Sequence, residues 1–317
     1  MQLTAPHGHH TRGALWAAAS ATAYSLSSVV GKDLLGSLGP TSLLFWRFTV
    51  ATAVLWTVLA IWRRHGGPDP LAVPRRIALL LGVVFGLLVL LGFYALQRLD
   101  ASVYIVVVYT YPVFVVVGSV LLGVRASRGT WGALALVMVG VVLTVPELFG
   151  GVGTISAVGV ALTVVQALMF AAYMIISSRL MPPSVDGVVS AAWITLGAGL
   201  VMAPIALLDG LVVPRGGSLL AEVGMFALIP TVVSSVCFFR ALRYVAPGVV
   251  AMVLTLEVAL VIVWSVVFLG ESVRPVQVLG ASTVVAGVLV AQRVHIRGAR
   301  ADVAANLAAT SLVPPVG

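Results

Sequence analysis

Ten apolar runs, each about the length that crosses a lipid bilayer, constrain this chain more than any other feature of its sequence. They cover residues 13–31, 41–62, 77–96, 101–123, 130–146, 155–178, 187–208, 221–240, 247–269 and 276–292. A membrane-spanning helix needs roughly 20 consecutive, mostly apolar residues. The valine-rich stretches do not alternate with polar residues as the strands of a membrane barrel do. The runs therefore predict an all-α integral membrane protein with ten transmembrane helices.

The composition excludes several other classes of protein. Hydrophobic residues make up 61% of the 317 residues and charged residues only 9%, against about 25% charged residues in an ordinary soluble domain. Such a chain cannot hide its apolar surface in water, which argues against a soluble enzyme, a nucleic-acid-binding protein and a disordered chain. The single cysteine, Cys237, permits no intramolecular disulfide.

Basic residues between the runs predict the orientation in the membrane. If the N-terminus is cytoplasmic, 13 of the 18 Lys and Arg residues fall in cytoplasmic segments, and Arg47 lies within a span. Short cytoplasmic loops are enriched in Lys and Arg. We therefore predict a multi-pass plasma (inner) membrane protein with both termini cytoplasmic, at 1–12 and 293–317. We expect irregular tails at both ends, including the histidine cluster at residues 7–10 and residues 298–317.

The two halves of the chain resemble each other at a spacing of about 147 residues. Lys32 matches Arg179, Trp46 matches Trp193, Gly123 matches Gly270 and Gly140 matches Gly287. Because each half, 13–146 and 155–292, holds five predicted spans, the second half is expected to be inverted relative to the first. Inverted repeats are a recurrent plan of secondary transporters.

Short motifs in both halves carry a family resemblance. Span nine contains Leu256-Glu257 and ends in Leu269-Gly270-Glu271, and span two contains Phe45-Trp46-Arg47-Phe48. Over residues 13–292 the chain resembles the EamA family of the drug/metabolite transporter superfamily. The resemblance implies a ten-span transporter of two EamA-like repeats that exports small metabolites, with amino acids the leading class.

Two charged residues lie inside predicted spans. Glu257, midway through span nine, is either a titratable proton-coupling group at the substrate cavity or a protonated side chain bonded to a neighbouring helix. Arg47, in the outer third of span two, either binds a substrate anion or has a structural role through snorkelling or backbone carbonyls. For Arg47 the structural role is favoured.

Polar and aromatic residues recur at helical spacing in two equivalent spans. Span one carries Trp16, Ser20, Tyr24, Ser27 and Gly31, and span six carries Thr163, Gln166, Phe170, Tyr173 and Ser177. Each set falls on one helix face. Because lipid does not favour a polar face, the paired stripes predict a cavity, with interhelical hydrogen bonding as the alternative for any single residue.

Other spans contribute further candidates for a mixed aromatic and polar pocket. They are Tyr104 and Tyr111 in span four, Trp264 in span nine, and Thr231, Ser234 and Phe238 in span eight. Aromatic packing is the alternative explanation. Pro112, Pro204 and Pro230 permit kinks, and Gly82-x-x-x-Gly86 predicts close packing of two helices.

The sequence contains no nucleotide-binding loop and no protease or hydrolase motif. We therefore expect no enzyme activity, no cofactor and no metal site. The expected partners are a small-molecule substrate, the bilayer and protons, without nucleic acid. We predict a secondary transporter working by alternating access, with an exchanger of organic anions or phosphorylated metabolites and a non-transporting scaffold as alternatives.

Overall fold

The computed structural model describes residues 8–99, 101–145, 156–269 and 273–311, and every regular element among them is a helix. The elements are α1 (Gly8–Arg64), α2 (Arg75–Leu96), α3 (Ala101–Val108), α4 (Tyr111–Leu121), α5 (Arg128–Leu143), α6 (Ala157–Leu180), α7 (Gly187–Leu208), α8 (Gly217–Ala227), the π-helix η2 (Leu228–Val233), α9 (Ser234–Tyr244), α10 (Pro247–Leu254), α11 (Leu256–Leu269) and α12 (Pro275–Ser311). The predicted all-α class is confirmed. An apolar chain adopts helices in lipid because each helix satisfies its own backbone hydrogen bonds.

Eight helical segments in the described part of the chain are long and apolar enough to cross a membrane. The helix Arg128–Leu143 is apolar but shorter, and the first predicted span lies in the N-terminal part of α1. The multi-pass character of the chain follows from these segments, while the count of ten spans stays a prediction.

Several helices are interrupted. α1 turns sharply at Gly39, which has a φ of 69°, a value that glycine adopts readily and other residues rarely adopt. The second half of α1 begins at Pro40. The fourth predicted span is broken between α3 and α4, and the ninth between α10 and α11. Pro112 lies in the first turn of α4, where a missing N–H costs nothing. The α10–α11 break contains no proline, so the sequence did not predict it.

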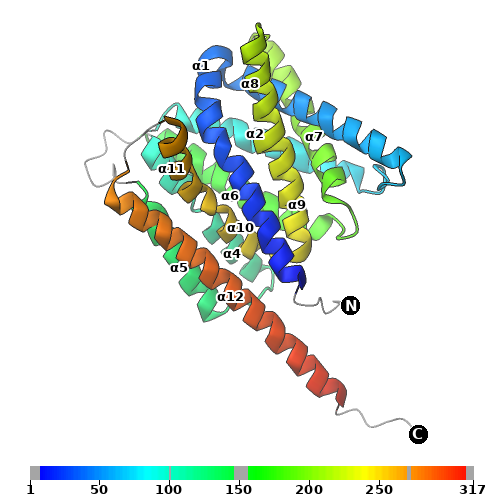
Figure 1. Cartoon of the computed structure of the whole chain (residues 1–317), viewed down its shortest axis with the longest axis vertical. Coiled ribbons are helices and arrows are strands. Elements are labelled where there is room, and N and C mark those ends of the chain that lie inside the picture. The colour runs from blue at the N-terminus through cyan, green and yellow to red at the C-terminus, as the bar shows by residue number, and fades with distance from the viewer. Residues whose placement is uncertain (1–7, 100, 146–155, 270–272, 312–317) are drawn as a thin grey trace.

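Helices from the two halves of the chain interleave. α1 packs against α7 and α9, and α2 packs against α6 and α7, which gives the crossed bundle in Figure 1. The close contact predicted for Gly82-x-x-x-Gly86 is confirmed. A Cβ on Gly82 would overlap the carbonyl oxygen of Ile194 and lie 2.8 Å from the Cα of Gly197.

A second glycine-lined contact joins α5 and α12, which run side by side in Figure 1. A Cβ on Gly140 would lie 2.6 Å from the backbone nitrogen of Val284, and one on Gly280 would lie 2.6 Å from that of Thr144. These two helices end the two predicted repeats, so equivalent helices face each other across a close backbone contact.

The expected irregular tails differ from the structure. α1 begins at Gly8, and α12 remains helical to Ser311, extending beyond the bundle (Figure 1). The expectation of an irregular tail is therefore wrong for residues 8–12 and 298–311. Residues 298–311 contain many alanines, and alanine is the strongest helix former. Residues 1–7 and 312–317 lie outside the described residues.

Candidate functional site

Arg47 is fully enclosed at one side of the bundle. Its side chain is 2% exposed. Nε donates to the hydroxyl of Thr231 at 2.6 Å, and Nη2 donates to the carbonyl oxygen of Pro230 at 3.3 Å. Both acceptors belong to η2, the π-helical turn between α8 and α9. Arg47 thus stabilises an irregular turn of one half from a helix of the other.

Three aromatic rings surround the Arg47 guanidinium. Its carbon lies 4.8 Å from the ring centroid of Phe226, 5.6 Å from that of Tyr24 and 5.9 Å from that of Phe48. Ring faces attract a cation, and the attraction strengthens when water is excluded. These rings, together with the η2 acceptors, offset the cost of burying the charge.

Glu257 lies in the first turn of α11, directly after the break between α10 and α11. The hydroxyl of Tyr109 lies close enough to its carboxyl group for the two side chains to interact. Tyr109 itself lies in the break between α3 and α4. The break between α3 and α4 and the break between α10 and α11 therefore lie next to each other at Glu257, the one acidic residue within span nine.

The two breaks share local chemistry. The Thr110 hydroxyl donates to the carbonyl oxygen of Val107 at 2.7 Å, and the Thr255 hydroxyl donates to that of Met252 at 2.6 Å. Each threonine hydroxyl thus bonds to the carbonyl three residues before it, a local bond that competes with regular helix pairing. The matching breaks occupy corresponding positions in the two repeats.

Arg47 and Glu257 interact electrostatically, but Arg47 forms no salt bridge with any described residue. Four tyrosines also lie within electrostatic reach of Glu257: Tyr24, Tyr104, Tyr109 and Tyr111. The site therefore combines one fixed positive charge, one titratable carboxyl group and several hydroxyl groups.

An aromatic wall adjoins this polar group. The rings of Tyr111 and Phe170 lie 4.8 Å apart, those of Phe170 and Tyr173 6.2 Å, and those of Tyr173 and Phe85 5.4 Å. The Tyr111 hydroxyl donates to the carbonyl oxygen of Ala251 at 3.2 Å. The wall thus joins α2, α4 and α6 and is tied to α10.

Several predicted residues form contacts between helices at some distance from these charges. The Ser20 hydroxyl donates to the carbonyl oxygen of Ser234 at 2.9 Å, and the Trp16 ring lies 4.8 Å from the Arg240 guanidinium. Trp264 Nε1 donates to the Ser25 hydroxyl at 2.8 Å. Ser27 has no hydrogen-bond partner among the described residues.

The equivalent stripe on α6 includes a second polar pair. The Tyr104 hydroxyl donates to Oε1 of Gln166 at 3.1 Å. Gly92 makes room for the pair, since a Cβ there would lie 2.8 Å from the Tyr104 hydroxyl and overlap the Gln166 amide. Each predicted stripe therefore has members that bond to neighbouring helices, such as Ser20 and Gln166, while Thr163 bonds within α6. A role in substrate binding stays a prediction for all twelve candidates.

Sequence reasoning missed three residues. Tyr109 follows an unbroken apolar run, and only the neighbouring Tyr111-Pro112 pair signals a helix break there. Thr52 Oγ1 and Trp56 Nε1, one turn apart on α1, are shielded from solvent and have no hydrogen-bond partner in the described part of the chain. Unpaired buried polar atoms are uncommon in proteins, and these two lie on the same helix as Arg47.

A comparison with known protein families assigns the chain to one of them. The model of the EamA-like transporter family matches residues 11–145 and again residues 157–292. The chain belongs to the EamA family. Two matches of nearly equal length confirm the resemblance noted in the sequence.

One solved structure, titled only "Crystal structure of protein", is similar in fold to this EamA chain. It is 19% identical, with a TM-score of 0.78 over 90% of this chain and 98% of its own. At that identity the likeness shows the fold alone. The search of curated proteins gives no match. Membership of the family indicates a membrane transporter and indicates no catalytic family.

Proposed function

We propose that this EamA protein exports a small amphipathic metabolite, such as an amino acid, by alternating access at a site between Arg47 and Glu257. The observation that carries the proposal is the meeting of two interrupted helices at Glu257 and Tyr109. In transporters built from repeats, discontinuous helices in corresponding positions form the substrate and ion sites near the bilayer midplane.

The chemistry of the site favours a substrate with an amino group and an apolar part. Glu257 interacts with the Tyr109 hydroxyl but has no salt-bridge partner among the described residues, so it can accept a substrate ammonium group or a proton. The adjoining wall of Tyr111, Phe170 and Tyr173 suits an apolar side chain. Competition between proton and substrate at one carboxyl group would couple export to proton entry.

Arg47 has a different place in the proposal. Its Nε and Nη2 donors are already bound to Thr231 and Pro230, which favours a structural role and a fixed positive potential. An exchanger of organic anions, in which Arg47 binds a carboxylate or phosphate, is the less favoured alternative because it requires those hydrogen bonds to be replaced.

We further propose ten spans in two inverted repeats, 13–146 and 155–292, in the plasma membrane. The N-terminal end of α1 and the C-terminal end of α12 lie at the same side of the bundle in Figure 1, as an even number of spans requires. The excess of Lys and Arg in the segments on that side supports cytoplasmic termini.

Counterflow exchange in proteoliposomes tests the transport proposal. Vesicles would be loaded with amino acids, nucleosides or organic phosphates, and uptake of the labelled compound measured without an ion gradient. Saturable exchange of amino acids is expected. Exchange of organic phosphates alone would favour the anion exchanger, and no exchange by folded protein across the panel would favour the non-transporting scaffold.

The Glu257→Gln substitution tests proton coupling. This variant should retain counterflow but lose uptake driven by a proton gradient. Glu222→Gln is the matched control, because Glu222 lies in the middle of α8 and is absent from the contacts described for Arg47 and Glu257. Gradient-driven uptake equal to that of the control variant would refute the role of Glu257.

A further inference from the structure

Two tryptophans bind the loops that follow the equivalent helix of the opposite repeat. Trp193, on α7, donates from Nε1 to the carbonyl oxygen of Pro70 at 2.8 Å, in the loop after α1. Trp46, on α1, donates from Nε1 to the carbonyl oxygen of Val212 at 2.9 Å, in the loop after α7. We call these contacts the Trp193 clasp and the Trp46 clasp.

The two clasps are related by the internal repeat. Trp46 and Trp193 are separated by 147 residues, the spacing that relates the two halves. Each tryptophan lies in the early turns of its helix, six residues after Pro40 or Gly187. The relation is reciprocal, because each helix holds the loop that leaves the other.

The Trp46 clasp binds its loop at several points. The Ser42 hydroxyl, one turn before Trp46, accepts from the backbone N–H of Val212 at 3.0 Å, so both backbone groups of Val212 are held. The Thr41 hydroxyl donates to Oδ2 of Asp209 at 2.7 Å. This loop is therefore anchored to α1 over its first four residues.

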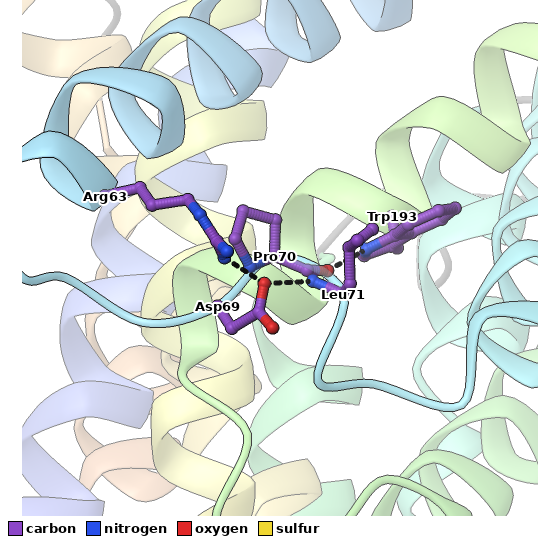
Figure 2. Close-up of polar contacts among 5 residues, drawn as sticks. All are labelled: Arg63, Asp69, Pro70, Leu71 and Trp193. Carbon is purple, nitrogen blue, oxygen red and sulfur yellow. Dashed lines mark hydrogen bonds and ion pairs between the residues drawn. The ribbon is translucent and has the colours of Figure 1, made fainter.

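The Trp193 clasp uses a preformed turn, which Figure 2 shows. The carboxylate of Asp69 pairs with Arg63 at the end of α1 and accepts from the backbone N–H of Leu71 at 3.1 Å. Pro70 has no N–H, so its carbonyl is the backbone group that the turn presents to Trp193 (Figure 2). The turn is thus tied to the end of α1 through Arg63, and the Pro70 carbonyl within it accepts a hydrogen bond from Trp193 on α7.

The clasps lie at different depths along the bundle. The Trp193 ring packs against the ring of Trp56 at 5.2 Å, and Trp56 is ten residues beyond Trp46 on α1. At 1.5 Å per residue, the clasps are about 15 Å apart along that helix. Arg47, Phe48 and the unpaired Thr52 hydroxyl lie on α1 between them.

From this reciprocal geometry we propose that the two clasps are the opposite gates of the transport cycle. When the protein opens at the end that contains the Trp193 clasp, Trp193 separates from Pro70 and the Trp46 clasp stays closed. When it opens at the end that contains the Trp46 clasp, Trp46 separates from Val212 and the Trp193 clasp stays closed. The inference rests on the proposed function, since gates have a purpose only in alternating access. Neutral hydrogen bonds contribute modest net stability, so each clasp favours closure without preventing release.

Accessibility of Cys237, the single native cysteine, tests the proposal without requiring transport. Cys237 is 5% exposed on α9, and its neighbour Val236 contacts the first residue of α7, so it reports on the Trp193 end. The full-length protein in lipid nanodiscs would be labelled with a membrane-impermeant maleimide. The variants are Trp193→Phe and Trp46→Phe, which remove an N–H donor and keep an aromatic ring.

The two variants should have opposite effects on the labelling rate. Loss of one neutral hydrogen bond corresponds to a population shift of about three- to tenfold. Trp193→Phe should raise the rate by that factor, Trp46→Phe should lower it, and the double variant should lie near the native rate. Trp131→Phe is the control, because Trp131 is exposed on α5. An increase in both single variants, or no labelling of Trp193→Phe, would overturn the proposal.

Hydrogen exchange of the loop amides provides a second readout. Trp193→Phe should increase exchange in residues 65–73 and decrease it in residues 209–216, and Trp46→Phe should do the reverse. Counterflow on the same variants separates the two proposals. Opposite labelling effects without counterflow of amino acids would retain the gates and refute the proposed substrate class, whereas counterflow with unchanged labelling and exchange would refute the gates alone.

Discussion

A single methyl group added at Gly82 should destabilise the contact between the two halves. The new Cβ would overlap the carbonyl oxygen of Ile194 and lie 2.8 Å from the Cα of Gly197. Both are backbone atoms of α7, so no side chain can rotate away, and α2 and α7 must move apart. Overpacking of this kind costs about 1–3 kcal/mol, which exceeds the gain of up to about 1 kcal/mol from replacing glycine by alanine in a helix.

Thermal unfolding in detergent measures this effect on Gly82→Ala against a matched control. Gly132→Ala is also a helical substitution in an apolar segment, but no atom lies within 4 Å of its added Cβ. An overpacking cost of about 2–3 kcal/mol, less about 1 kcal/mol for the helix gain, leaves a net loss of about 1–2 kcal/mol. At about 2–4 °C per kcal/mol for domains of 150–250 residues, we expect the Gly82→Ala midpoint to fall by roughly 2–8 °C. The control should keep or raise its midpoint. A Gly82→Ala midpoint equal to that of the control would refute the steric argument.

Three further predictions follow from named contacts. Arg47→Ala should lower thermal stability by about 1–3 kcal/mol, because the Pro230 carbonyl loses its Arg47 donor, while the Thr231 hydroxyl keeps its bond to the carbonyl oxygen of Phe226; an unfolding midpoint unchanged from the native protein would contradict this. Gly280→Ala should loosen α5 from α12, seen as faster amide exchange in both helices but not in α7. The Leu71 hydrogen bond, followed by Arg63 and Arg75, holds the pKa of Asp69 below its usual value. Its contribution is therefore present above about pH 4 and lost as the pH falls through the lower folded value, so protection factors in residues 65–73 should drop under acid in the native protein and change less in Asp69→Asn.

The helical architecture could be predicted from the sequence because lipid imposes a simple rule on backbone hydrogen bonds. Each apolar run overlaps a helix, and Gly82-x-x-x-Gly86 does pack closely against a neighbour. The break at Thr255 could not be predicted, since threonine is common in intact helices and no proline marks the site. Pro204, in contrast, lies within the unbroken helix α7, so proline alone does not locate the breaks.

The charged residues of the candidate site were visible in the sequence because a charge inside an apolar run requires a partner. Their partners were not visible. Tyr109 interacts with Glu257 from a different half of the chain, and Thr231 and Pro230 bind Arg47 from nearly 200 residues away. The stripes on α1 and α6 have the correct periodicity, but only the structure shows that Ser20 bonds to Ser234 and Gln166 to Tyr104.

The glycine contact and the tryptophan clasps have different roles if the halves rock against each other. Gly197 is the eleventh of the 22 residues of α7, so the closest approach to α2 lies near the middle of that helix, where a rocking motion displaces atoms least. The clasps bind loops at the helix ends, where displacement is greatest. A defect at the pivot should therefore slow opening at both ends equally, whereas loss of one clasp should favour one end over the other. Gly82→Ala should reduce counterflow without the opposite labelling effects expected for the tryptophan variants, and opposite effects in Gly82→Ala would show that α2 and α7 move as part of a gate.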